Sequence, residues 1–116
     1  VDLESKGMGR GMYEISKCDW KLFRERVPEW QERYMEHLAK QYIELLSSPG
    51  LASEHFWELE KRIKEDKKNP GVQLEIRKSE AIWDIAMFVR YNIIQLNDLE
   101  GFSDDLALVV KMILNR

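Results

Sequence analysis

The chain has 116 residues, of which 44% are hydrophobic and 34% are charged. This length suits one domain and is short for two. The formal net charge of -3 argues against a surface built mainly to bind phosphates. No run of about 20 apolar residues, the length that spans a bilayer, is present. With no signal segment at its start, the sequence predicts a soluble cytoplasmic protein.

The N-terminal part differs in composition from the rest of the chain. Residues 1–13 hold Gly7, Gly9 and Gly11 among charged residues and show no apolar periodicity. Termini of this kind are commonly unpacked. We therefore expect a flexible N-terminal segment over 1–13, followed by a single helical domain over 14–116.

Two helices are predicted on either side of Pro28. Ser16 is a favourable N-cap, so the first helix is expected over 17–26. Pro28 lacks a backbone N–H and disfavours helical geometry in the residue before it, which predicts a break or strong kink. A second helix over 28–46 follows, because apolar side chains recur there at helical spacing opposite a charged face. Its apolar stripe comprises Trp30, Tyr34, Leu38, Tyr42 and Leu45, and is flanked by Met35, Ile43 and Leu46.

A third helix is predicted after the turn residues at 47–50. Ser53 is its expected N-cap, and the helix is expected to end before Asn69-Pro70-Gly71. Its apolar stripe comprises Phe56, Leu59 and Ile63. The remaining positions carry charges of both signs, with Glu58–Arg62 and Glu60–Lys64 at a spacing that favours ion pairs.

The apolar segment Ala81–Val89 organises the predicted fold. Only Asp84 interrupts it, and a helix that is apolar around most of its circumference is buried on more than one side. We expect this segment to form the second half of a central helix over 72–91. A single helical turn is expected over Asp98–Glu100. A last helix is predicted after Ser103, which caps it, with Leu106, Val109, Val110 and Ile113 facing inward. The expected architecture is an all-α compact bundle of about five helices.

One concentration of positive charge raises the hypothesis of nucleic-acid binding. Five basic side chains fall within 61–68, and Arg77 and Lys78 follow. Four acidic residues, Glu58, Glu60, Glu65 and Asp66, are interleaved with the basic residues of this helix, so the net charge over 58–68 is close to zero. A solvated helix face is the interpretation that this pattern favours.

No set of residues suited to catalysis or metal binding is found in the sequence. His55 and Glu58 have a spacing that can share a metal, but no second matching pair is present. The acidic residues near Gly101 do not fit a calcium-binding loop. Cys18, the only cysteine, excludes an intrachain disulfide and has no histidine near it in sequence; a small, partly buried residue is expected there. We therefore predict a protein that is not an enzyme and that needs no metal or cofactor.

Asp84 is the single residue that most suggests a binding role. An ionised carboxylate on an apolar face has to be paired or reach solvent. We expect an ion pair with Arg24, Arg33, Arg62 or Lys78, or exposure on a narrow polar edge. The alternative is that Asp84 receives a cationic group from a partner. The candidate interaction residues are Trp83, Asp84, Met87, Lys61, Arg62, Lys64 and Lys68.

Four segments of the chain resemble those of a family of short, all-helical bacterial proteins of no established function. They are SKCDWKLFR at 16–24, PEWQERY at 28–34, FWELEKRIK at 56–64 and DLEGFS at 98–103. The resemblance covers the chain from Ser16 to its end. It implies a bacterial, cytoplasmic origin and assigns no functional residue.

The sequence as a whole predicts a small protein-protein interaction or regulatory module. Its helix faces are well patterned, and no nucleophile, base or metal set converges. The surplus of apolar side chains predicts a homodimer through the central or the last helix. The alternative function is a nucleic-acid-associated regulator that uses the basic residues of 61–78.

Overall fold

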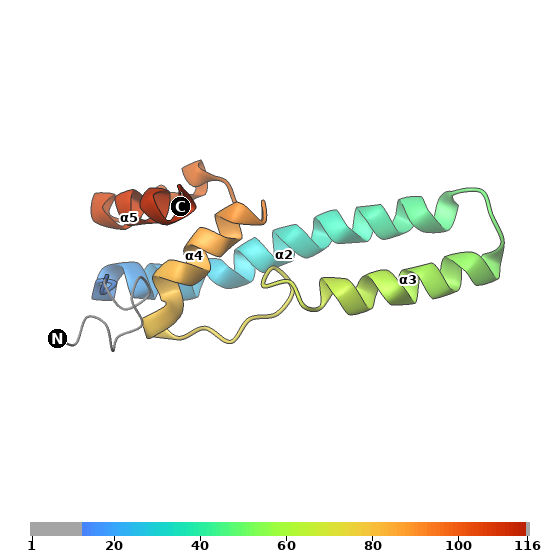
Figure 1. Ribbon diagram of the computed structural model, residues 1–116, viewed down its shortest axis with the longest axis horizontal. Coiled ribbons are helices and arrows are strands. Elements are labelled where there is room, and N and C mark those ends of the chain that lie inside the picture. Colours follow the sequence, from blue (N-terminus) through green and yellow to red (C-terminus); the bar gives the residue numbers. More distant parts are fainter. Residues whose placement is uncertain (1–12, 116) are drawn as a thin grey trace. The chain divides into compact units, whose positions relative to one another are not determined.

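The computed structural model describes residues 13–115, which are helical throughout their regular structure (Figure 1). The described part of the chain contains four α-helices and two short 3-10 helices, without a strand. The all-α class is therefore confirmed, but the prediction of about five helices was wrong by one. Apart from Tyr13, the segment expected to be flexible lies outside the described residues.

The chain divides into two compact units, which are described separately below. Within the described residues, the terminal unit comprises 13–28 and 75–115, and the hairpin unit comprises 29–74. The expected single helical domain over 14–116 and the compact bundle of the whole chain stay predictions.

Helix α2 (Lys17–Ser47) replaces the two helices that were predicted around Pro28. Its start is as expected, because the Ser16 hydroxyl oxygen accepts the backbone N–H of Asp19 at 3.1 Å. The predicted break was wrong: Pro28 lies inside the helix. Phe23 and Val27 on one side of the proline and Trp30 on the other are all buried. Burial of these side chains offsets the roughly 3 kcal/mol that an interior proline costs a helix.

Helix α3 (Ala52–Asp66) follows a four-residue loop. Gly50 in this loop has φ +136°, a conformation that side-chain-bearing residues rarely adopt. The helix begins one residue before the predicted cap, Ser53. The carboxylate of Glu54 accepts the backbone N–H of Leu51 at 3.1 Å, so a first-turn glutamate satisfies this donor instead.

The central helix is shorter than predicted. It was expected over 72–91, but helix α4 spans Ala81–Arg90 and is preceded by the 3-10 helix Lys78–Glu80. Residues 73–77 form neither helix nor strand. Half-buried and exposed side chains alternate along this stretch, and alternation of this kind is the period of extended backbone. The half-buried positions are Val72, Leu74 and Ile76.

The core of the terminal unit lies between α4 and α5 (Asp104–Leu114). Half of the α4 residues are buried, as the apolar run predicted, among them Ile85 and Phe88. Three of the four residues predicted to face inward on the last helix are buried: Leu106, Val110 and Ile113. Arg90 links the C-terminal ends of α4 and α5. Its Nη2 donates to the carbonyl oxygens of Ile113 at 3.3 Å and Leu114 at 3.4 Å.

Two turns connect α4 to α5. Asn92 has φ +62° and follows the end of α4, a position where asparagine tolerates the left-handed conformation. The 3-10 helix Leu96–Leu99 comes next and matches the predicted single helical turn to within two residues. Gly101, with φ +98°, then reverses the chain ahead of Ser103.

A buried carboxylate joins the first turns of α2 and α5. Asp19 is 3% exposed, and its two oxygens accept the backbone N–H of Ser103 at 3.0 Å and the hydroxyl of Ser103 at 2.6 Å. The same hydroxyl oxygen accepts the N–H of Leu106 at 3.2 Å, which confirms Ser103 as the cap of the last helix. These hydrogen bonds compensate the cost of removing a charged group from water.

We predict that Asp19→Ala lowers the free energy of unfolding by about 2–3 kcal/mol, because it removes both partly buried hydrogen bonds that join the first turn of α2 to Ser103. Urea unfolding of the full chain measures the loss. Asp104→Ala, which removes an exposed first-turn carboxylate of α5, is the matched control and should cost about 0.3–1 kcal/mol. Equal losses in the two variants would contradict the role assigned to Asp19.

Candidate functional site

The hairpin unit consists of the α2 residues from Glu29 onward, the 48–51 loop and α3, which run side by side (Figure 1). A connection of four residues makes the two helices antiparallel neighbours. On α2, Leu38 is buried and Tyr42 and Leu45 are half-buried. On α3 no residue is buried, and Leu59 is half-buried. The two helices therefore share only a narrow apolar seam.

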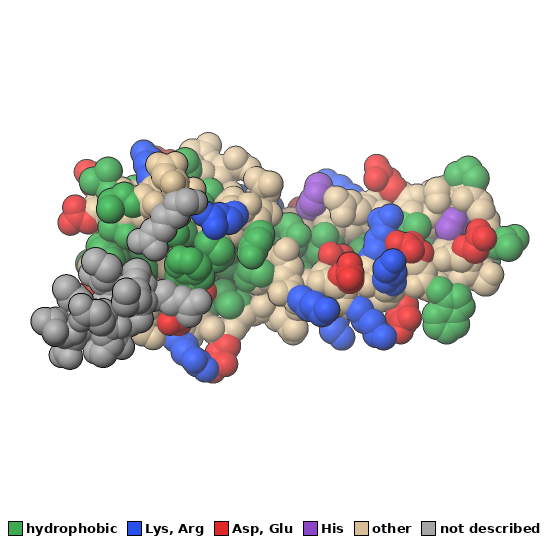
Figure 2. Space-filling model, in the orientation of Figure 1, with side chains coloured by type: hydrophobic (Ala, Val, Ile, Leu, Met, Phe, Trp, Pro, Cys, Tyr) green, Lys and Arg blue, Asp and Glu red, His purple; other side chains and the backbone are tan. Residues whose placement is uncertain are grey.

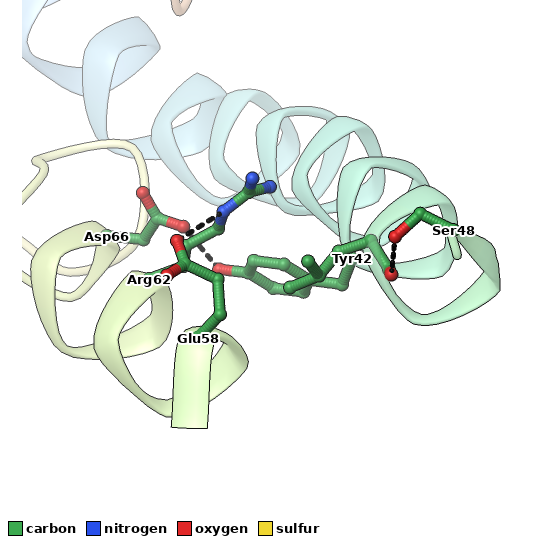
Figure 3. A network of polar contacts seen from close by, with 6 residues as sticks. Tyr42, Ser48, Glu58, Arg62 and Asp66 are labelled. Carbon is green, nitrogen blue, oxygen red and sulfur yellow. Dashed lines mark hydrogen bonds and ion pairs between the residues drawn. The ribbon is translucent and has the colours of Figure 1, made fainter. Parts of the chain in front are cut away.

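A tyrosine-carboxylate contact crosses this seam. The Tyr42 hydroxyl donates a short hydrogen bond to Asp66 Oδ2 (Figure 3). Next to it on α3, Arg62 Nε and Glu58 Oε2 are 3.3 Å apart and form an ion pair. Tyr42 was predicted as part of an apolar stripe, and its ring does line the seam, but its hydroxyl forms a polar link between the two helices.

At the open end of the hairpin, opposite the 48–51 loop, side chains of α2 form hydrogen bonds with the turn that follows α3. Gln31 Nε2 donates to the carbonyl oxygen of Pro70 at 2.8 Å, and Asn69 Nδ2 donates to the Tyr34 hydroxyl at 3.3 Å. Gly71 lies against the Tyr34 ring, where an added Cβ would come within 2.5 Å of Cδ2. Only glycine fits at this position without displacing the ring, so residues 31–34 and 69–71 are held level with each other.

At the closed end of the hairpin, where the 48–51 loop joins α2 to α3, the side chain of His55 contacts the loop. Its Nε2 lies 3.2 Å from Ser48 Oγ and 3.3 Å from the carbonyl oxygen of Pro49. The Ser48 hydroxyl donates to the carbonyl oxygen of Leu45 at 2.7 Å, so both neighbours of Nε2 act as acceptors and the ring hydrogen lies on Nε2. His55 therefore organises the loop. Among the described residues, no three His, Cys, Asp or Glu side chains are grouped so as to hold a metal.

Large apolar side chains remain exposed along one side of the hairpin. They are Met35, Ile43, Leu46, Phe56 and Ile63, each between 38% and 63% exposed, and we call them the apolar face. At 3.6 residues per turn, the α2 members lie between about a sixth of a turn (Met35) and about two fifths of a turn (Ile43) from the seam, and Phe56 and Ile63 are displaced by about 40–60° in the same rotational sense on α3. Because the two helices are antiparallel, rotations of the same sense bring both sets to the same side of the hairpin.

The opposite side of the hairpin is charged. The same helical arithmetic places His37 and Glu44 of α2 there, with Glu58 and Glu65 of α3. Figure 2 shows a face of the hairpin on which red, blue and purple side chains predominate, with green side chains at its closed end. The hairpin is thus amphipathic as a whole.

Trp57 extends the apolar surface around the closed end. It is 62% exposed, and its ring meets that of Phe56 edge to face at a centroid distance of 4.9 Å. Aromatic pairs of this geometry attract each other beyond their area of contact. The pair provides a rigid aromatic tip, and exposed aromatic groups of this size are typical of interaction sites.

The structure separates the predicted interaction residues into two groups. The side chains of Lys61, Arg62, Lys64 and Lys68 are exposed and belong to the hairpin unit. Lys64 Nζ lies 3.7 Å from Glu60 Oε2, so this ion pair and the Glu58–Arg62 pair both form at the predicted spacing.

The second group, Trp83, Asp84 and Met87, is half-buried on α4 of the terminal unit. Asp84 already takes part in an interaction, so it is not a free carboxylate. Whether it also receives a cation from a partner stays a prediction. Cys18 was expected to be partly buried but is exposed. Its position on the outer side of the first turn of α2 gives it no core role.

The apolar face was not predicted as a site from the sequence, although its residues were assigned to the predicted apolar stripes of the two helices or to positions flanking them. Phe56 and Ile63 were predicted to face inward, and Ile43 and Leu46 to flank the inner stripe of α2. The apolar arc on α2 is wider than one neighbouring helix covers, and that width was the available signal.

Comparisons with protein-family models, with curated proteins and with solved structures give no match. The resemblance to a family of short helical bacterial proteins stays a prediction. Of the helices in the described residues, none is both long and apolar enough to cross a membrane.

The seam contact predicts a pH dependence of stability. Burial, and then the hydrogen bond and charge of Asp66, raise the pKa of Tyr42 from 10.0 to about 12. The folded state therefore holds this proton more tightly than the unfolded state, and the resulting stability is present below pH 10 and is lost as the pH rises from 10 to 12. Tyr42→Phe should cost about 1 kcal/mol at pH 7 and flatten the fall in stability over that range.

Urea unfolding at a series of pH values measures both effects. Tyr91→Phe, at an exposed tyrosine, is the control and should reproduce the parent curve. Burial, and to a lesser extent the charge of Asp66, also raises the pKa of Tyr34. Part of the fall in stability with rising pH is therefore expected to remain in Tyr42→Phe. An unchanged slope would show that the contact with Asp66 does not stabilise the hairpin.

Proposed function

We propose that the protein is a non-enzymatic interaction module that binds another protein through the apolar face of its hairpin unit. One observation carries the proposal: α3 has no buried residue, while Phe56 and Trp57 on it are 61% and 62% exposed. Large apolar patches on a folded surface mark sites that another molecule covers.

The energetics of the hairpin support a covering partner. Isolated helices of about 12–15 residues are marginal in water, and helices in proteins gain most of their stability by packing an apolar face. Helix α3 has 15 residues and packs only half-buried side chains within its unit. A partner on the apolar face would remove Ile43, Phe56 and Ile63 from water, with a gain of roughly 25 cal/mol for each Å².

The shape of the apolar face favours a helical partner. Its members come from two parallel rows, with Ile43 and Leu46 on α2 and Phe56 and Ile63 on α3. Ala39 lies between the apolar residues of α2 and is exposed. A small residue between large ones leaves room for an incoming side chain. An amphipathic helix laid along two such rows is a recurrent mode of recognition.

The charges of α3 favour protein over nucleic acid as the partner. Arg62 and Lys64 already form ion pairs with Glu58 and Glu60, and Arg77 pairs with Glu75 at 3.3 Å. Phosphate binding would have to break or share these pairs beside the carboxylates that make them. A nucleic-acid-associated regulator that uses 61–78 is therefore the less favoured function.

A cytoplasmic setting suits this module. Cys18 is an exposed free thiol. Such a group persists in its reduced form where thiol buffers keep the compartment reducing.

We predict that a photo-crosslinking amino acid at position 56 yields discrete protein adducts in cells that naturally express the chain. The reason is that a partner covers the Phe56 side chain. The same amino acid in place of Glu44, on the charged side of the hairpin, is the matched control and should give none. Adducts are detected by gel mobility and mass spectrometry before and after nuclease treatment. Absence of adducts at 56, or adducts that nuclease removes, would refute the proposal.

A further inference from the structure

We infer that the partner on the apolar face is a second copy of this chain, in a two-fold symmetric dimer. In this dimer α2 of one protomer lies over α3 of its partner, with the closed ends of both hairpins at the same end. The inference rests on the proposed function and names the occupant of the same surface.

The size of the apolar face matches one side of a stable dimer interface. Its five members and Trp57 are each at least 38% exposed. With roughly 150–250 Å² for each large side chain, they present on the order of 500–800 Å² of apolar surface. Stable interfaces bury about 800 Å² on each partner. A symmetric contact uses the same patch twice, so a second copy has an apolar surface of equal size and chemistry.

Two hairpins placed face to face form a four-helix bundle, an architecture in which each helix packs against two neighbours. This arrangement would bury Phe56 and Ile63 of α3, which the single chain leaves exposed. Ala39 on α2 and Ala52 on α3 are small residues next to the large ones. They provide the depressions into which side chains of the facing hairpin fit.

The charged residues at the edges of the apolar face, which we call its rims, favour one pairing of helices between the two copies. Beside the apolar face, the outer edge of α2 carries Glu32 and Glu36, and the outer edge of α3 carries Lys64 and Lys67 with Glu60, the ion-pair partner of Lys64, between them; all five are exposed. The Tyr34–Asn69 hydrogen bond keeps these stretches level within one hairpin. Placing α2 over α2 would bring acidic rims together. Placing α2 over α3, with the closed ends together, puts Glu36 of each protomer beside Lys67 of the other.

The described part of the terminal unit, residues 13–28 and 75–115, offers less apolar surface for such a contact. Ile82, Ile85 and Phe88 of α4 are already buried within that unit. On α5 and its neighbouring turns the exposed large side chains, Leu108, Met112, Tyr91 and Leu96, carry no basic and acidic rim comparable to that of the hairpin.

The oligomeric state of the full chain tests the inference. Light scattering across a concentration range should give twice the chain mass of 13.8 kDa. Ile43→Glu should raise the dissociation constant on the order of 100-fold, because it places a charge within the apolar face that the second copy would cover. Glu44→Lys, one residue away on the charged side, is the matched control and should leave the dimer intact.

Circular dichroism at the same concentrations shows whether Ile43→Glu remains helical. If its helices are lost, Phe56→Lys, at a 61% exposed position on the other helix, replaces it. A helical monomer in either variant supports the inference, and a dimer that both variants retain overturns it. A monomeric parent chain also overturns it, although a crosslink from position 56 to a different protein would leave the proposed function standing.

The rim charges provide a separate test of the register. Glu36→Lys and Lys67→Glu should each weaken the dimer about fivefold at low salt, and the double variant should recover the parent affinity, because the two charges exchange places. Additive weakening in the double variant would overturn the pairing of α2 with α3.

Discussion

The uneven burial of apolar side chains governs this structure. Almost all the buried apolar residues in the described chain belong to the terminal unit, and only Trp30 and Leu38 fall within residues 29–74. The hairpin unit has helices of ordinary length, yet it covers little of its own apolar surface. Burial of apolar surface is the dominant favourable term in folding and association. A molecule bound to the hairpin would therefore gain more free energy from apolar burial than one bound to the terminal unit.

Polar contacts position the helices where apolar packing is thin. Asp19 clamps the first turns of α2 and α5 through Ser103, and Arg90 closes the opposite end of α5. In the hairpin, Tyr42 with Asp66 and Gln31 with the carbonyl of Pro70 connect the two helices. These bonds set the spacing and level of α2 and α3, so the apolar face is held in one arrangement before any partner binds. A surface organised in advance loses less conformational entropy on binding.

Local signals predicted several features correctly. Ser16 and Ser103 begin helices as expected, and the charge pairs of α3 form at their predicted spacing. Each of these depends on residues within one helical turn. The predicted helix break at Pro28 and the predicted helix over 72–77 were wrong. Burial of Phe23, Val27 and Trp30 holds the helix through the proline, and the alternation of Val72, Leu74 and Ile76 was overlooked in favour of a longer helix.

The sequence by itself determined the all-α class, the starts of α2 and α5 and the burial of α4, because helix caps and apolar periodicity act over a few residues. Only the tertiary structure decided which apolar residues are left outside. Phe56 and Ile43 have the composition and spacing of core residues, and their exposure depends on how many helices pack around each row. The partners of Asp19 and Tyr42 lie 84 and 24 residues away, so their pairing likewise arises from the folded chain.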